Sequence, residues 1–109
     1  MSYEVIPTPD FKKFFKRLAK KYPSLKSDLA QLIVRLEQEP DAGVYLGHNL
    51  YKVRMAISSK GKGKSAGARI ITYMQSEQNE VFLVHIYDKS QLDNISKKQI
   101  LEIIISAGL

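Results

Sequence analysis

The sequence predicts an α+β domain in which an N-terminal helical hairpin packs on a small, mainly antiparallel sheet. Apolar residues recur at helical spacing between residues 9 and 36 and again near the C-terminus. The period is two in residues 51–57, and two further runs before residue 88 are rich in strand-forming side chains. A chain of 109 residues has room for one hydrophobic core and not for two. We therefore expect one domain over residues 1–109 with the order β-α-α-β-β-β-α.

The N-terminal third predicts a short strand followed by two helices. The strand is expected over residues 3–6. The first helix begins with Thr8 as its N-cap and Pro9 at its first position, and it ends at Pro23. The second helix begins at Ser24, which we expect to be its cap, and ends at the next proline. Because the connection is so short, the two helices should lie antiparallel.

Three strands and a final helix are expected in the remainder. Residues 51–57 alternate between apolar and basic side chains, so the basic ones share one face. Residues 68–74 and 81–87 are also rich in strand-forming side chains, and residues 77–79 predict a hairpin turn between them. The last helix is expected from a cap at Ser96 to roughly residue 105. In residues 51–57 the apolar side chains are those of Tyr51, Val53, Met55 and Ile57, and the basic side chains are those of Lys52 and Arg54.

Composition excludes several classes of protein and site. The chain has no cysteine, so disulfides, thiolate nucleophiles and cysteine-ligated zinc are excluded. No apolar run approaches the roughly 20 residues that span a bilayer, and the N-terminus lacks the pattern of a signal peptide. Histidine and carboxylate residues do not have metal-ligand spacing. We therefore expect a cytoplasmic protein with no membrane partner, no metal and no cofactor.

The excess positive charge is confined to the middle of the sequence. The chain has 17 basic and 11 acidic residues, and no acidic residue lies between Asp41 and Glu77. Outside that segment the chain has equal numbers of basic and acidic residues. Phosphates of a nucleic acid are the first candidate partner for such a segment, and an acidic protein is the second. A solvated surface is the alternative. The six basic residues of the segment are Lys52, Arg54, Lys60, Lys62, Lys64 and Arg69.

Residues 58–67 alternate lysine with glycine and end in small residues before Arg69. Glycine permits close approach of the backbone to a ligand, and lysine supplies cationic groups. The segment is not a Walker loop, because the glycine spacing differs and a strand follows rather than a helix.

Three segments in this order, residues 51–54, 60–71 and 84–89, closely resemble the RelE/ParE toxin superfamily. The similarity is greatest to the HigB-type RelE branch, in which a K-x-R strand, a KGKxGGxR hairpin and a Y-x-K strand end recur. It covers nearly the whole chain, and Ala66 stands where the branch often has glycine.

The resemblance implies a RelE-like fold and a toxin of a type II toxin–antitoxin system. RelE members enter the ribosomal A site and cut mRNA there without a metal. Lys52, Arg54 and Arg69 would face a common phosphate, and the fork of an arginine suits the developing phosphorane charge. Tyr87 would stack on a base or move a proton, Lys89 would add a further cation, and either lysine could act as base. The implied contacts to the RNA backbone are Lys60, Lys62 and Lys64.

The resemblance also implies partners and leaves alternatives open. We expect a cognate antitoxin of helix-turn-helix type, ribosomal RNA and mRNA in the A site, and operator DNA only through the antitoxin. A ParE-like inhibitor of DNA gyrase without hydrolytic activity, or a non-toxic RNA-binding relative, remains possible. Tyr87 alternates with His85, Leu83 and Val81, so it could instead pack beside a core face. A lone strand histidine such as His85 is more often structural than catalytic.

Overall fold

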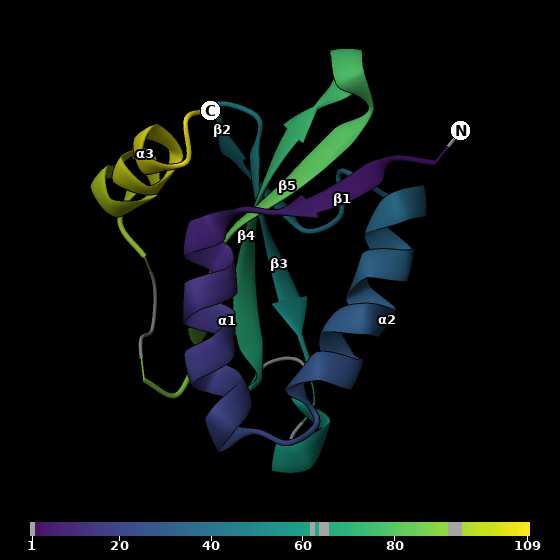
Figure 1. Cartoon of the computed structure of the whole chain (residues 1–109), viewed down its shortest axis with the longest axis vertical. Coiled ribbons are helices and arrows are strands. Elements are labelled where there is room, and N and C mark those ends of the chain that lie inside the picture. Colours follow the sequence, from purple (N-terminus) through teal and green to yellow (C-terminus); the bar gives the residue numbers. More distant parts are fainter. Residues whose placement is uncertain (1, 62, 64–65, 92–94) are drawn as a thin grey trace.

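The computed structural model describes residues 2–61, 63, 66–91 and 95–109, and it confirms the α+β class. The described part contains three helices and five strands (Figure 1). The elements are β1 (Glu4–Pro7), α1 (Pro9–Lys21), α2 (Leu25–Gln38), β2 (Val44–Gly47), β3 (Leu50–Met55), β4 (Ala68–Gln75), β5 (Glu80–Asp88) and α3 (Lys97–Ser106).

The strands form one sheet in the order β1-β5-β4-β3-β2. β1 pairs parallel with β5, and the other pairs are antiparallel, as the sequence predicts for most of the sheet. β2 is an additional strand that the predicted order lacks. It joins β3 through a tight turn in which His48 and Asn49 have φ angles of 52° and 64°. Positive φ angles at both central turn residues are typical of β-hairpins, because the turn then matches the right-handed twist of the strands.

Two of the three predicted helix caps are confirmed. The Thr8 hydroxyl accepts a hydrogen bond from the N–H of Phe11, at 3.3 Å. Ser96 forms a complete capping box with Gln99 at the start of α3. The prediction for Ser24 is wrong in its chemistry: its hydroxyl makes no cap bond to the backbone. It donates instead to the Asp28 carboxylate at 2.8 Å, one turn further along α2.

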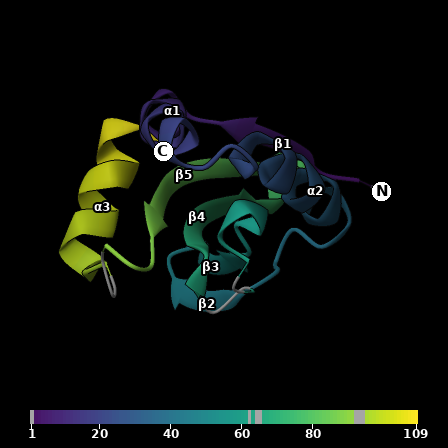
Figure 2. The ribbon, with the colours of Figure 1, turned by 90° about the horizontal axis from the view of Figure 1, so that it is seen from below.

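The helices cover the two faces of the sheet unequally. α1 and α2 lie on one face, and α3 lies against the other face next to β5 (Figure 2). Val53, Met55 and Ile57 lie in the core beneath the helical hairpin of α1 and α2, which confirms the predicted alternation of β3. The core on the α3 side contains Leu50, Ile71, Val84, Tyr87, Ile95, Ile100 and Ile104.

A β-bulge in β5 changes which face its side chains occupy. The register shifts between Ile71 and Thr72 of β4, so that Ile71 pairs with His85 and Thr72 pairs with Leu83. Val84 is the extra residue of the bulge. Leu83 therefore lies in the core under the helical hairpin, whereas Tyr87 lies on the α3 side. The predicted common alternation of Tyr87 with Leu83 is wrong, because a bulge shifts the period by one residue.

Candidate functional site

Three of the predicted catalytic residues form one row across the sheet. Arg54 of β3 is the direct cross-strand partner of Arg69 in β4, and Arg69 is the direct partner of Tyr87 in β5. Directly paired residues of antiparallel strands project from the same face. Because adjacent strands are about 4.8 Å apart, the three Cα positions span roughly 10 Å. This row lies on the face opposite the helical hairpin.

Lys52 and Lys89 flank this row. Lys52 precedes Arg54 by two residues on β3 and shares its face, and it pairs with Ile71. It borders a hollow of about 200 Å³ between β3 and α3, to which Lys97 also contributes. Lys89 directly follows β5, where its backbone N–H donates to the Gly67 carbonyl at 3.1 Å. The fold thus places four of the predicted catalytic residues at the ends of β3, β4 and β5, and Lys52 lies two residues from Arg54 toward the middle of β3.

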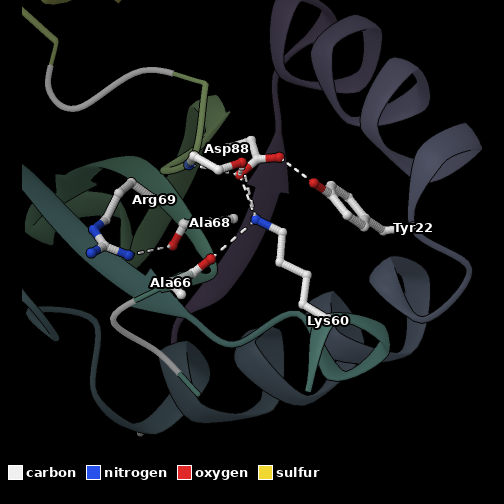
Figure 3. Close-up of polar contacts among 7 residues, drawn as sticks. Tyr22, Lys60, Ala66, Ala68, Arg69 and Asp88 are labelled. Carbon is white, nitrogen blue, oxygen red and sulfur yellow. Dashed lines mark hydrogen bonds and ion pairs between the residues drawn. The ribbon is translucent and has the colours of Figure 1, made fainter. Parts of the chain in front are cut away.

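Access to the row differs from one end to the other. Arg54 is exposed, whereas Arg69 and Tyr87 are only 5% and 6% exposed. Arg69 donates from Nη1 to the Ala68 carbonyl at 3.2 Å (Figure 3). Tyr87 belongs to the core that contains Ile100 and Ile104 of α3. The C-terminal helix therefore covers the tyrosine end of the row in this conformation.

Tyr87 has a protonated hydroxyl at neutral pH. Burial raises the pKa of Tyr87 above its ordinary value of 10.0, and the charge of Arg69 opposes that shift. The hydroxyl oxygen is buried and has no hydrogen-bond partner in the described part of the chain. A protonated phenol can donate a proton or a hydrogen bond to a ligand oxygen, and none of the described residues already takes that donor.

His85 is packed as a structural residue. Its ring meets the ring of Phe14 edge-on, with 4.5 Å between centroids. Burial lowers the pKa of His85, and the carboxylate of Asp10 opposes this effect. The imidazole is therefore neutral at pH 7. This environment agrees with the structural alternative that the sequence favours for a lone strand histidine.

Lys60 does not have the environment of a mobile contact to RNA. Its ammonium donates to the Asp88 carboxylate at 2.7 Å and to the Ala66 carbonyl at 3.1 Å (Figure 3). It also lies 5.0 Å from the centroid of the Tyr22 ring. The Lys60–Asp88 pair is 14% and 0% exposed in its side chains. The other two predicted RNA contacts, Lys62 and Lys64, lie outside the described residues.

Sequence reasoning missed Asp88. The signal was present, because an aspartate between Tyr87 and Lys89 interrupts the apolar end of a strand. Its partner Lys60 is 28 residues away, so no local pattern connects the two.

Neither a metal cluster nor a membrane span is found in the described residues. No group of three or more His, Asp or Glu side chains there could hold a metal ion. No helix in that part of the chain is long and apolar enough to cross a bilayer.

Comparison with known proteins identifies the family of the chain and agrees with its fold. Residues 11–108 match the family model of the RelE toxin of the RelE/RelB toxin–antitoxin system. The free Escherichia coli toxin RelE, solved as a double arginine-to-alanine mutant, has 16% sequence identity and a TM-score of 0.66, with 97% of this chain and 98% of that chain covered. The RelBE2 toxin–antitoxin complex from Mycobacterium tuberculosis contains a chain with 13% identity and a TM-score of 0.59, with 81% and 92% covered. Because the family model spans most of the sequence, the chain belongs to the RelE family of toxins from toxin–antitoxin systems.

Proposed function

We propose that this toxin is an endoribonuclease that cleaves mRNA in the ribosomal A site and so inhibits translation. The observation that carries the proposal is the cross-strand row of Arg54, Arg69 and Tyr87, with Lys52 beside it on the same face. Two guanidinium groups and a protonated phenol in one row match the requirements of phosphodiester cleavage. The order of motifs along the chain supports membership of the HigB-type branch.

In the proposed reaction the 2′-oxygen attacks the adjacent phosphorus and the bond to the 5′-oxygen breaks. Lys52 or Lys89 is the proposed acceptor of the proton of the 2′-hydroxyl. Arg54 and Arg69 hold the non-bridging oxygens, where negative charge grows in the pentavalent transition state. Tyr87 donates its proton to the departing 5′-oxygen, and solvent restores that proton afterwards. The products are a 2′,3′-cyclic phosphate and a 5′-hydroxyl. No metal has a part in this scheme.

The proposed partners follow from the same assignment. A cognate antitoxin of helix-turn-helix type would neutralise the toxin and carry the complex to operator DNA. Lys62 and Lys64 are proposed contacts to ribosomal RNA, on the strength of the sequence alone. Lys60 is omitted from that group, because its ammonium already has partners within the protein.

Induced expression with two labels tests the proposal. Incorporation of labelled methionine should stop within minutes while incorporation of labelled thymidine continues, and primer extension should map cuts within translated mRNA. Continued translation with an SOS response would instead indicate a gyrase inhibitor. Continued growth with RNA binding would indicate a non-toxic relative.

A variant pair connects the activity to the row. Arg69→Ala should abolish growth arrest, because the transition-state charge loses a guanidinium. Arg35→Ala, which removes a partly exposed arginine of α2 paired with Glu39, should leave arrest intact. Circular dichroism of both purified variants checks that they fold, and full toxicity of folded Arg69→Ala would exclude Arg69 from the mechanism.

A further inference from the structure

Asp88 is a fully buried carboxylate at the end of β5, directly after the candidate catalytic residue Tyr87. Its side chain is 0% exposed, and each oxygen has a donor. Oδ1 accepts from the Lys60 ammonium at 2.7 Å and from the N–H and hydroxyl of Ser90 at 3.0 and 2.7 Å. Oδ2 accepts a short hydrogen bond from the Tyr22 hydroxyl. These donors hold the pKa of Asp88 well below its ordinary value, against the effect of burial.

Lys60 joins this carboxylate to the segment that leads into β4. Its ammonium donates to Asp88, to the Ala66 carbonyl at 3.1 Å and to the Ser90 hydroxyl at 3.3 Å. Tyr22, at the C-terminal cap of α1, contacts both charged groups. Figure 3 shows Lys60 and Tyr22 approaching Asp88 from different elements. Three segments far apart in sequence therefore meet at one ion pair: the end of α1, the connection between β3 and β4, and the end of β5.

A second carboxylate fixes the chain from which Lys60 projects. Asp28 of α2 accepts from the Ser58 N–H at 3.0 Å and from the Ser58 hydroxyl at 2.5 Å. Ser24 accepts from the Ser59 N–H at 2.8 Å and donates to Asp28. The backbone at residues 58–59 is thus held against α2 immediately before Lys60. The ammonium reaches Asp88 from an anchored position.

The ion pair lies directly behind the candidate catalytic row. Asp88 pairs with Ala68 across the sheet, and the next pair along is Tyr87 with Arg69. Because side chains alternate along a strand, Asp88 points toward the hairpin and Lys60 while Tyr87 points to the opposite face. The strand ends that carry Arg69 and Tyr87 are therefore held from the rear face of the sheet.

We propose that Asp88, through its buried pair with Lys60, is a positioning residue that holds Tyr87 and Arg69 in the geometry needed for RNA cleavage. This inference rests on the proposed function and deepens it. Neither charged group touches the substrate. A displacement of about 1 Å of a catalytic group can cost roughly 100-fold in rate, so loss of this anchor should lower the rate of the chemical step rather than affinity.

Single-turnover cleavage by the refolded full-length protein tests the assignment. Ribosomes programmed with a short mRNA are mixed with excess toxin, and the rate is measured against toxin concentration. Asp88→Asn and Lys60→Met should each lower the maximal rate about 10- to 100-fold, with a half-saturating concentration changed less than about threefold. Lys60→Arg, which keeps the charge and can bond Asp88, should recover most of the rate.

The double variant Asp88→Leu with Lys60→Met separates positioning from folding. Removing both partners of a buried ion pair leaves no unpaired charge, so the double variant should lose less of the thermal midpoint than either single variant. The maximal rate should remain low, because an apolar pair cannot reproduce the bonds to Ala66, Ser90 and Tyr22. Asp41→Asn and Lys26→Met remove the same charges at exposed positions and should change neither quantity.

Three results would overturn the assignment. A folded double variant with the wild-type maximal rate would show that the pair positions nothing. A raised half-saturating concentration with an unchanged maximal rate in Lys60→Met would make Lys60 a contact to RNA. Absence of cleavage by the wild-type protein would remove the proposed function itself, and this inference with it.

Discussion

Tyr87 combines a buried position with a hydroxyl that has no partner among the described residues. An unsatisfied buried polar group costs about 1–3 kcal/mol, and such a cost calls for an explanation. In the proposed function the explanation is that the hydroxyl is kept as a donor for the leaving oxygen. Thr72 has a similar buried hydroxyl, but it pairs with Leu83 on the hairpin side of the sheet.

Tyr87→Phe should therefore raise stability and lower activity. We expect the free energy of unfolding to rise by up to about 1 kcal/mol, because an unsatisfied hydroxyl is removed from the core. Cleavage should fall about 100- to 10,000-fold, because a general acid is lost. Denaturant unfolding and single-turnover cleavage measure the two effects.

Thr72→Val is the matched control for that variant. It also removes a buried hydroxyl without a partner in the described residues, but on the other face of the sheet, so it should gain stability and keep its cleavage rate. If Tyr87→Phe cleaves as fast as the wild type, the hydroxyl has no part in the reaction.

At the scale of elements, the approach of β3 to the segment before β4 depends on Gly67. A Cβ atom at this position would lie 2.1 Å from the Met55 carbonyl oxygen and 3.0 Å from the Ala56 Cα. Gly61, in the same connection, has open space around it and a φ of 68°. The two glycines are therefore required for different reasons, one steric and one conformational.

Gly67→Ala should destabilise the domain more than Gly61→Ala. The Gly61 substitution costs about 1 kcal/mol for a left-handed alanine. The Gly67 substitution forces two backbones apart, which costs typically 1–3 kcal/mol and sometimes more, and it displaces Arg69 from Arg54. Urea denaturation gives the two free energies, and equal losses would contradict the close approach.

At the scale of the whole molecule, the two faces of the sheet serve different purposes. The hairpin face is closed by α1 and α2, whereas α3 covers only part of the opposite face (Figure 2). The basic residues of β3 lie on that opposite face. Lys52 and Arg54 therefore place part of the excess positive charge on that face, whereas Lys60 is paired with Asp88 inside the fold.

The salt dependence of RNA binding should show which face of the sheet contacts the phosphates. Each phosphate contact to a single strand contributes about 0.7 to the slope of log affinity against log salt concentration. Lys52→Gln or Arg54→Gln should reduce that slope by roughly this amount, whereas Lys20→Gln, on an exposed position of α1, should not. Filter binding of a non-cleavable 2′-methoxy RNA over a salt series measures this slope. Equal slopes for all variants would show that the RNA does not contact Lys52 and Arg54 in preference to other basic residues.

Local patterns were sufficient for most elements. The caps at Thr8 and Ser96, the two helices of the hairpin and the placement of Lys52 and Arg54 on one face follow from interactions within a few residues. β2 was not predicted, because its four residues directly follow Gly43, end in Gly47 and give little periodic signal. The bulge at Val84 was not predicted, because it depends on the register of β5 with β4. The sequence therefore could not show that Tyr87 and Leu83 lie on opposite faces of the sheet.

By itself, the sequence determined the fold class, the family resemblance and the location of the excess charge, because periodicity, capping and motif order are local properties. Only the tertiary structure decided which strands are neighbours, and it is their register that aligns Arg54, Arg69 and Tyr87. It also decided that Lys60 faces inward. Its partner Asp88 lies 28 residues away, and burial makes pairing there far more favourable than leaving that carboxylate unpaired.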